Sequence, residues 1–286
     1  MDKLRVLDLF AGIGGFSVGL ERTGGFETVA FCEIESYPQK VLAKNWPGVP
    51  IYDDVRELTA ERLVADGIGV DVITGGFPCQ DISAAGNQAG IGEGTRSGLW
   101  SECARLLGEL RPRYAIFENV TALLSGDNGR WFEQVLWDIS SLGYDAEWHC
   151  IPASELGAHH HRDRVWIICS TNSLCGVERP KQERKYQRPK DNTGICQDVA
   201  DTPSQRQPGQ GEHEQSLFAE ALGKGQTANA LPSGKPEIWK AEPELGRVVD
   251  GVSSRSHSHR LKCLGNAVVP QIPELIGRAI LEAGHG

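Results

Sequence analysis

The sequence predicts an α/β protein with a doubly wound, mostly parallel β-sheet, and three observations support this. Apolar, strand-like runs alternate with helix-like stretches through the first 170 residues. A glycine-rich turn joins the first run to the first helical stretch, and the last residues return to an amphipathic helical pattern. At 286 residues the chain is long enough to bury a sizeable core.

The expected elements follow one another in a regular order. Strands are expected at residues 5–10, 27–32, 70–74, 114–118 and 164–169. Helical stretches lie near 15–22, 36–45, 97–110 and 130–142. After residue 264, the sequence "PQIPELIGRAILEAG" predicts a helix that rejoins the sheet.

The chain divides into three parts by composition. Residues 1–170 form the α/β domain, and 171–255 are polar and rich in Gln, Pro, Gly and basic residues. That middle part is either a linker-like insert or a small, loop-rich domain that folds around a ligand. Residues 256–286 contain the returning helix.

Charge and cysteine usage narrow the class of protein. The net charge of −9 argues against a nucleic-acid partner, but residues 178–190 contain six Lys/Arg against two Glu, so a basic face remains possible. The eight cysteines form no Cys-x-x-Cys pair, which argues against a zinc ribbon and favours free thiols. No apolar run reaches about 18 residues and no signal segment is evident, so we expect a cytoplasmic protein without a membrane span.

The first strand leads into "DLFAGIGGF", where Gly12, Gly14 and Gly15 form a turn that lets a ligand approach the backbone. Glu33 follows the second strand, where a carboxylate would bind ribose hydroxyls, and Asp54 could accept from an adenine amino group. Without further phosphate-binding residues, this pattern favours an adenosyl ligand that lacks phosphates. The alternative is a turn that serves only close packing.

The stretch "GGFPCQ" places Cys79 just after an apolar strand, on a loop constrained by glycines and proline. Glu118 in "IFENV" ends another strand of the same sheet. Because ligands bind at the carboxyl ends of parallel strands, a thiol and a carboxyl meeting there predict a nucleophile and a proton donor. The alternative is an inert cysteine in a turn.

In "HHHRDRVWIIC", Arg162 and Arg164 alternate on the approach to a strand, so both could point to one face and bind a phosphate or carboxylate. A solvated charged face is the alternative. Three consecutive histidines diverge on an extended chain and have no nearby ligand at metal-binding spacing, so no metal is expected.

These stretches, with "GNAVVP" near the C-terminus, resemble the DNA (cytosine-5)-methyltransferase family, in particular its bacterial, phage- and prophage-borne members. The motifs are "DLFAGIGGF", Glu33, "GGFPCQ", "ENV", Arg162–Arg164 and "GNAVVP", six in the family's order, and they span residues 4–169 and 246–283. The resemblance implies a Rossmann-like fold that binds S-adenosyl-L-methionine, with a target recognition domain at 171–255.

The resemblance also implies residue roles in catalysis. Cys79 would attack C6 of a flipped-out cytosine, and Glu118 would hydrogen-bond or protonate N3. Arg164 would hold the cytosine O2 and position the thiol, with Arg162 as the second catalytic arginine.

Further roles concern the cofactor and the substrate. Phe10 would stack on the adenine, Glu33 would hold the ribose and Asp54 would bind the adenine. Pro78 would shape the thiol loop, the stretch "FPCQ" at residues 77–80 that carries Cys79. Asn266 would brace the catalytic and recognition parts. The full cofactor-site set is Phe10, Gly12, Gly14, Gly15, Glu33, Asp54, Pro78 and Asn266. The substrate-binding set is Gln80, Ser83, Asn119 and Val120.

The implied function is methyl transfer to cytosine C5 in double-stranded DNA, as in restriction–modification systems, by a monomer. His160 stands where the family commonly has Gln. Three alternatives remain: an RNA cytosine methyltransferase, a DNA-binding regulator with an inactive site, and a nicotinamide oxidoreductase. The oxidoreductase would leave the "FPCQ" and "ENV" pair without a purpose.

Overall fold

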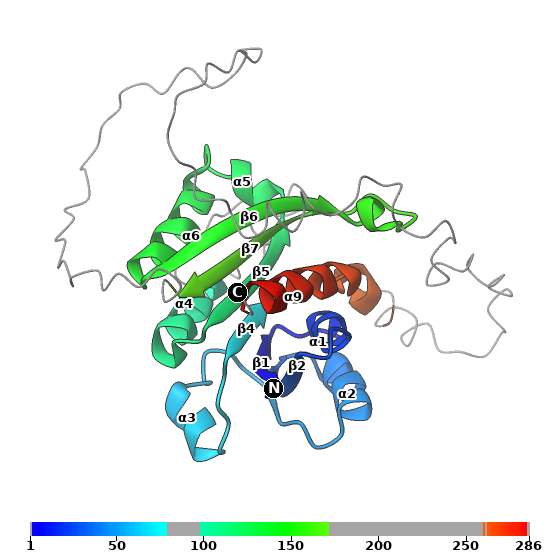
Figure 1. Cartoon of the computed structure of the whole chain (residues 1–286), viewed down its shortest axis with the longest axis vertical. Coiled ribbons are helices and arrows are strands. Elements are labelled where there is room, and N and C mark those ends of the chain that lie inside the picture. The colour runs from blue at the N-terminus through cyan, green and yellow to red at the C-terminus, as the bar shows by residue number, and fades with distance from the viewer. Residues whose placement is uncertain (1, 79–97, 172–259, 261, 285–286) are drawn as a thin grey trace, which may run out of the picture.

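The computed structural model describes residues 2–78, 98–171, 260 and 262–284. In this part of the chain, seven strands form one sheet in the order β3-β2-β1-β4-β5-β7-β6 (Figure 1). The strands are β1 Leu4–Leu9, β2 Phe26–Cys32, β3 Ile51–Tyr52, β4 Val72–Gly75, β5 Tyr114–Val120, β6 Tyr144–Pro152 and β7 Asp163–Thr171. Strand β7 runs antiparallel to both its neighbours, β5 and β6, and the other pairs are parallel.

Helices cover both faces of this sheet, which confirms the doubly wound α/β prediction. Helices α1 and α9 pack together on one face, while α4 and α6 lie on the other (Figure 1). The helical segments are α1 Gly15–Glu21, α2 Ser36–Asn45, α3 Ala60–Ala65, α4 Leu99–Leu110, α5 Ala122–Ser125, α6 Arg130–Ser141, the 3₁₀ turn η2 Ala153–Leu156 and α9 Gln271–Ala283.

The hydrophobic core lies in two layers because the central strands are apolar on both faces. Along β1, Val6 packs with the α1 and α9 side, whereas Leu7 and Leu9 pack with the α4 and α6 side. Helix α9 contributes Ile272 and Ile276 to the first layer. The expected return of the C-terminal helix to the sheet is therefore confirmed.

The edge of the sheet differs from expectation. Strand β6 was not expected, because its sequence mixes polar and apolar residues and resembles neither a buried run nor a helix. It pairs only with β7 within the described residues, and several of its side chains are exposed, as edge positions allow. None of the described helices is long and apolar enough to cross a membrane.

Candidate active site

The reversed direction of β7 brings the predicted arginine to the predicted acid. Strands β1, β4 and β5 are parallel, so their carboxyl ends lie along one edge of the sheet, perpendicular to the strands. Antiparallel β7 begins at that same edge, with Arg164 paired opposite Val120. The Arg164 Nε lies 2.9 Å from Oε1 of Glu118. The two side chains are only 22% and 12% exposed, so this ion pair is largely shielded from water.

Burial raises the pKa of Glu118 above its ordinary value, and the charges of Arg164 and Arg162 partly oppose that rise. Gly76 allows the carboxyl to approach the thiol loop, because a Cβ added there would lie 3.3 Å from Glu118 Oε2. The site therefore holds a carboxyl that keeps a proton to higher pH than a free Glu does. Such a group is suited to donate to a ring nitrogen.

The chain enters the thiol loop from a fixed point. Phe77 is buried, and its ring packs against Trp100 and Phe117 with centroids 5.1 and 6.5 Å apart. The Asn119 side-chain amide donates to the Phe77 carbonyl over 3.2 Å. Pro78 follows, half-buried, and the residues predicted to react or bind next, Cys79, Gln80 and Ser83, lie outside the described residues.

Asn119 and Val120, predicted to bind substrate, have structural contacts of their own. Asn119 is 2% exposed, and its Oδ1 accepts from the Val120 backbone N–H over 2.8 Å. Val120 packs against the core layer beneath α4 and α6. Both residues lie at the predicted edge, and their contacts favour support of the thiol loop. Substrate binding by either stays a prediction.

The glycine turn after β1 has the left-handed backbone that its sequence suggests. Gly12 and Gly14 have φ of 55° and 85°, and Phe10, a non-glycine residue, has φ of 52°. A left-handed conformation costs a non-glycine residue about 1–2 kcal/mol, so the surrounding fold must hold Phe10 in place. A Cβ added at Gly14 would lie 2.5 Å from the Trp46 ring, whereas Gly12 faces open space.

Glu33 lies against this turn, as expected. Its Oε2 accepts from the Gly12 N–H over 2.8 Å, and its Oε1 accepts from the Glu35 N–H over 2.7 Å. The side chain is largely buried, which raises its pKa, although these backbone bonds oppose the rise. Each carboxylate oxygen can accept a second bond, so ribose hydroxyls could still be bound.

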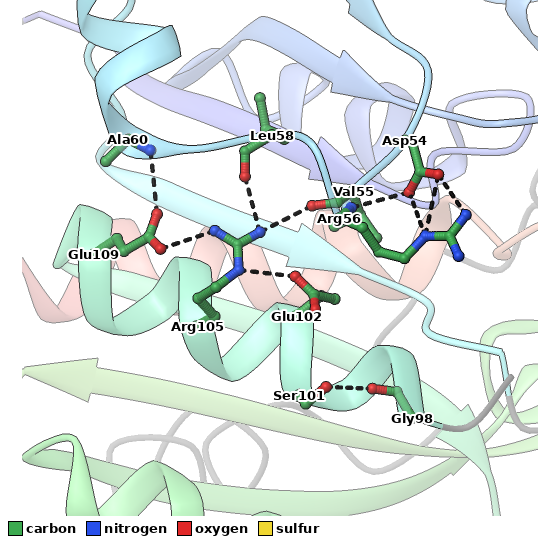
Figure 2. A network of polar contacts seen from close by, with 10 residues as sticks. All are labelled: Asp54, Val55, Arg56, Leu58, Ala60, Gly98, Ser101, Glu102, Arg105 and Glu109. Atoms are coloured by element: carbon green, nitrogen blue, oxygen red, sulfur yellow. Dashed lines mark hydrogen bonds and ion pairs between the residues drawn. The ribbon is translucent and has the colours of Figure 1, made fainter. Parts of the chain in front are cut away.

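Asp54 is engaged by its own neighbour. Its carboxylate accepts from the Arg56 side chain at 2.5–3.1 Å, which lowers the pKa of Asp54 (Figure 2). Asp54 nevertheless lies near Glu33, because it follows β3 by two residues and the Glu33 N–H donates to the β3 carbonyl of Tyr52 over 2.9 Å. Burial raises the pKa of the Cys32 thiol to about 12, and the charges of Glu33 and Asp54 add to that rise. The acid is thus near the expected nucleoside site but already ion-paired.

Arg105 of α4 fixes the backbone that follows Asp54. Its guanidinium donates to the carbonyls of Val55 and Leu58, and it pairs with Glu102 and Glu109 (Figure 2). Helix α4 is the first helix described after the thiol loop. No sequence pattern singles out Arg105, since its carbonyl partners lie about 50 residues earlier.

A buried acid was also missed. Asp8 is fully buried within β1, and it accepts from Ser17 Oγ over 2.9 Å and from Thr74 Oγ1 over 2.8 Å. Burial raises the pKa of Asp8 to about 7. It thereby joins the glycine-turn helix α1 to β4, the strand that leads into the thiol loop. The acid within the apolar run "RVLDLF" was the available sign of this role.

Arg162 and Asn266 are the remaining predicted residues. The Arg162 guanidinium donates to the carbonyls of Gly265 and Ala267 over 2.7 and 3.0 Å. The two arginines were expected to share one target, but in this structure Arg164 pairs with Glu118 and Arg162 with backbone. Asn266 lies between the two accepting residues, with its side chain exposed. No cluster of potential metal ligands occurs among the residues that the structure describes.

The sequence model of the C-5 cytosine-specific DNA methylase family matches residues 4–240. The chain belongs to this family. Among relatives of the C-5 cytosine methylase family, the type II methyltransferase M.HgiBI of Herpetosiphon aurantiacus is 37% identical over 169 residues, 59% of this chain and 37% of the relative. M.HhaI of Haemophilus parahaemolyticus is 35% identical over 171 residues, 60% of this chain and 50% of the relative. The matched part of the chain thus spans half or less of the length of these relatives.

Solved structures give the same picture of this C-5 cytosine methylase fold. A DNA modification methyltransferase encoded within a prophage (E. coli) is 30% identical, with a TM-score of 0.52 over 60% of this chain and 48% of that one. DNMT2 of Spodoptera frugiperda, 22% identical with a TM-score of 0.50 over 63% of this chain and 54% of that one, shares the fold. The prediction of a Rossmann-like methyltransferase fold is confirmed.

Proposed function

We propose that the protein transfers a methyl group from S-adenosyl-L-methionine to C5 of a cytosine in double-stranded DNA. The observation that carries the proposal is the shielded Glu118–Arg164 pair at the sheet edge, beside the loop that leads to Cys79. Membership in the C-5 cytosine-specific DNA methylase family supports the reaction class.

Cytosine C5 is too weak a nucleophile to accept a methyl group unaided, which explains the need for a thiol. In the proposed mechanism the Cys79 thiolate adds to C6, and the electron pair of the C5–C6 bond becomes available at C5. That electron pair would form the bond from C5 to the methyl group. Loss of the C5 proton to a base, with expulsion of the thiolate from C6, then restores the aromatic ring and frees Cys79. The sulfonium donor supplies an electrophilic methyl group when bound.

Glu118 would assist the addition by placing a proton at N3 of the cytosine, where negative charge develops. Its raised pKa supports this role, because the carboxyl holds a proton more readily than a free glutamic acid. The fixed Arg164 guanidinium would donate to the cytosine O2 while it keeps the carboxyl oriented. Both groups are pre-positioned, so little reorganisation is needed.

The residues at the glycine turn fit an adenosyl donor. Gly12 faces open space, its N–H is bonded to Glu33, and Phe10 is half-buried at the same turn. We expect Glu33 to hold the ribose and Phe10 to contact the adenine. Asp54 would accept from the adenine amino group once the Arg56 side chain no longer occupies its carboxylate. No Gly-Lys-Ser/Thr follows the turn in the sequence, which agrees with a donor without phosphates.

The DNA substrate requires the target base to leave the stack, because C6 is inaccessible to a thiol within a duplex. Flipping one base costs a few kcal/mol, which contacts to the phosphates would offset. The basic residues at 178–190 are candidates for those contacts by sequence, and they lie outside the described residues.

Mechanism-based trapping tests the proposal. The wild-type protein and Cys79→Ser would be incubated with S-adenosyl-L-methionine and duplex DNA that contains 5-fluorocytosine, in which fluorine blocks the final elimination. We expect an adduct that survives denaturation with the wild type only. A parallel reaction with 5-fluorocytosine RNA identifies an RNA enzyme if only RNA is trapped. Absence of any adduct with bound donor would contradict the proposal.

A further inference from the structure

The contacts of Arg162 link two parts of the chain that are far apart in sequence. Arg162 precedes β7, and its guanidinium donates to Gly265 and Ala267, 103 and 105 residues later. The guanidinium is planar and presents its donors at fixed angles, so the two carbonyls are held at a set spacing. The backbone of Arg162 has a φ of 40°, in the left-handed region. A non-glycine residue keeps this conformation only where surrounding contacts maintain it.

The segment that Arg162 holds lies directly against the glycine-turn helix. A Cβ added at Gly15 would lie 2.6 Å from the Val268 carbonyl oxygen and 2.9 Å from the Val268 Cβ. One added at Gly19 would lie 2.2 Å from the Pro270 carbonyl oxygen. Val268 and Pro270 therefore pack so closely on α1 that a side chain at Gly15 or Gly19 would overlap them. Three residues before Gly265, Lys262 Nζ pairs with Glu35 Oε1 at 2.6 Å on the surface.

We propose that Arg162 is a positioning residue, which clamps residues 265–267 so that Val268 stays seated on the first turn of α1. Through this contact it fixes the glycine turn that would bind the methyl donor. Arg162 differs in this from Arg164, which pairs with Glu118 at the reacting edge. The inference rests on the proposed function only where it concerns the donor. The clamp itself depends only on the hydrogen bonds of Arg162 and on the packing of Val268 against α1.

Two variants separate the clamp from the charge of Arg162. Arg162→Lys keeps a positive charge near Glu118 but cannot bind both carbonyls with a fork of donors. Arg162→Met removes both the charge and the bonds while it keeps much of the side-chain volume. Arg164→Lys serves as the matched control, since it alters the neighbouring arginine without touching Gly265 or Ala267.

Hydrogen–deuterium exchange of the full-length chain is the first readout. In both Arg162 variants we expect the amides of residues 267–269, 271 and 272 and of the first turn of α1 to exchange about tenfold faster, because their local opening becomes easier. Arg164→Lys should leave these amides unchanged. Unchanged exchange in Arg162→Met would overturn the proposal, whether or not the wild type methylates DNA.

Steady-state kinetics is the second readout. We expect both Arg162 variants to raise the KM for S-adenosyl-L-methionine about tenfold with a smaller change in kcat, and Arg164→Lys to lower kcat chiefly. If Arg162→Lys lowers kcat as Arg164→Lys does and leaves donor KM and exchange unchanged, Arg162 acts on the base instead. If the wild type is inactive on every polymer, donor affinity by calorimetry replaces KM, and the clamp is tested without the proposed reaction.

Discussion

The side-chain amide of Asn119 donates to the backbone carbonyl of Phe77, two residues before Cys79. This bond joins the end of β5 to the start of the thiol loop. It is buried and is supported by the packing of the Phe77 ring on Trp100. The strand that carries Glu118 therefore also holds Phe77, two residues before Cys79, so the proposed acid and the segment leading to the proposed nucleophile share one support.

Asn119→Ala should remove the bond between the end of β5 and Phe77. The change leaves the Phe77 carbonyl and the Val120 N–H without their partner, which we expect to lower the free energy of unfolding by about 1–3 kcal/mol. Urea denaturation measures the stability, and single-turnover methylation measures the expected loss of rate. Gln134→Ala, which removes an amide bonded to Asp138 on α6, is the control and should leave the rate unchanged. An unchanged rate in Asn119→Ala would argue against this support.

The pH dependence of methylation should report Glu118. Its pKa is raised by burial, so the protonated form persists to higher pH than in a free glutamic acid. As pH rises through that pKa, the proton is lost and kcat should fall. Removal of the main opposing charge in Arg164→Met should raise the pKa further and move this fall to higher pH. Glu118→Gln should abolish the fall and slow the reaction by about 10²–10⁴-fold, as expected for loss of a general acid.

A pH–rate profile of the wild type and the two variants makes this measurement. The exposed Glu133→Gln on α6 is the matched control and should reproduce the wild-type profile. A fall of kcat that persists in Glu118→Gln would assign it to another group.

The buried Asp8 predicts a pH dependence of stability. Its pKa is about 7 when folded and near 4 when unfolded, so the folded state binds the proton more tightly. The stabilising contribution is complete below the unfolded pKa and is lost as pH rises through the folded pKa. By linkage the loss of stability between pH 4 and pH 7 is about 4 kcal/mol.

Asp8→Asn isolates this effect. An amide can still bond the hydroxyls of Ser17 and Thr74, yet it does not titrate. We expect the stability difference between wild type and variant, measured by urea denaturation, to change steadily between pH 4 and pH 8, with the variant gaining relative to the wild type. A constant difference would mean that the pKa of Asp8 is not raised.

The glycine turn offers a matched pair of substitutions. Gly15→Ala places a Cβ against the Val268 carbonyl and should destabilise the fold by about 1–3 kcal/mol, as overpacking does. Gly12→Ala meets no atom within 4 Å, so it adds only the strain of φ 55°, about 1 kcal/mol, while its methyl group faces the proposed donor site. Thermal denaturation should therefore show the larger stability loss for Gly15→Ala. Donor calorimetry should show weaker affinity in both variants, through the added methyl group in Gly12→Ala and through displacement of Val268 in Gly15→Ala. Unchanged donor affinity in Gly12→Ala would place the donor elsewhere.

Local patterns in the sequence were sufficient for most of the fold and for the candidate residues. Apolar runs and the glycine turn predict the central strands, because burial on both faces demands continuous apolar sequence. The motifs around Glu33, Cys79, Glu118 and Arg164 predict a site at one sheet edge, and the structure brings Glu118 and Arg164 together there. The edge strand β6 escaped prediction because an edge position tolerates mixed polarity.

The tertiary structure alone decided which partners these side chains have. The antiparallel entry of β7 puts Arg164 beside Glu118, and the path of the C-terminal segment gives Arg162 the carbonyls of Gly265 and Ala267. Asp8, Asn119 and Arg105 likewise bind groups 9 to 66 residues away. Short-range sequence patterns fix local backbone and burial, whereas such contacts arise only when distant segments pack. The same physics explains why the sequence could suggest candidate reacting groups and only the fold could show what holds them.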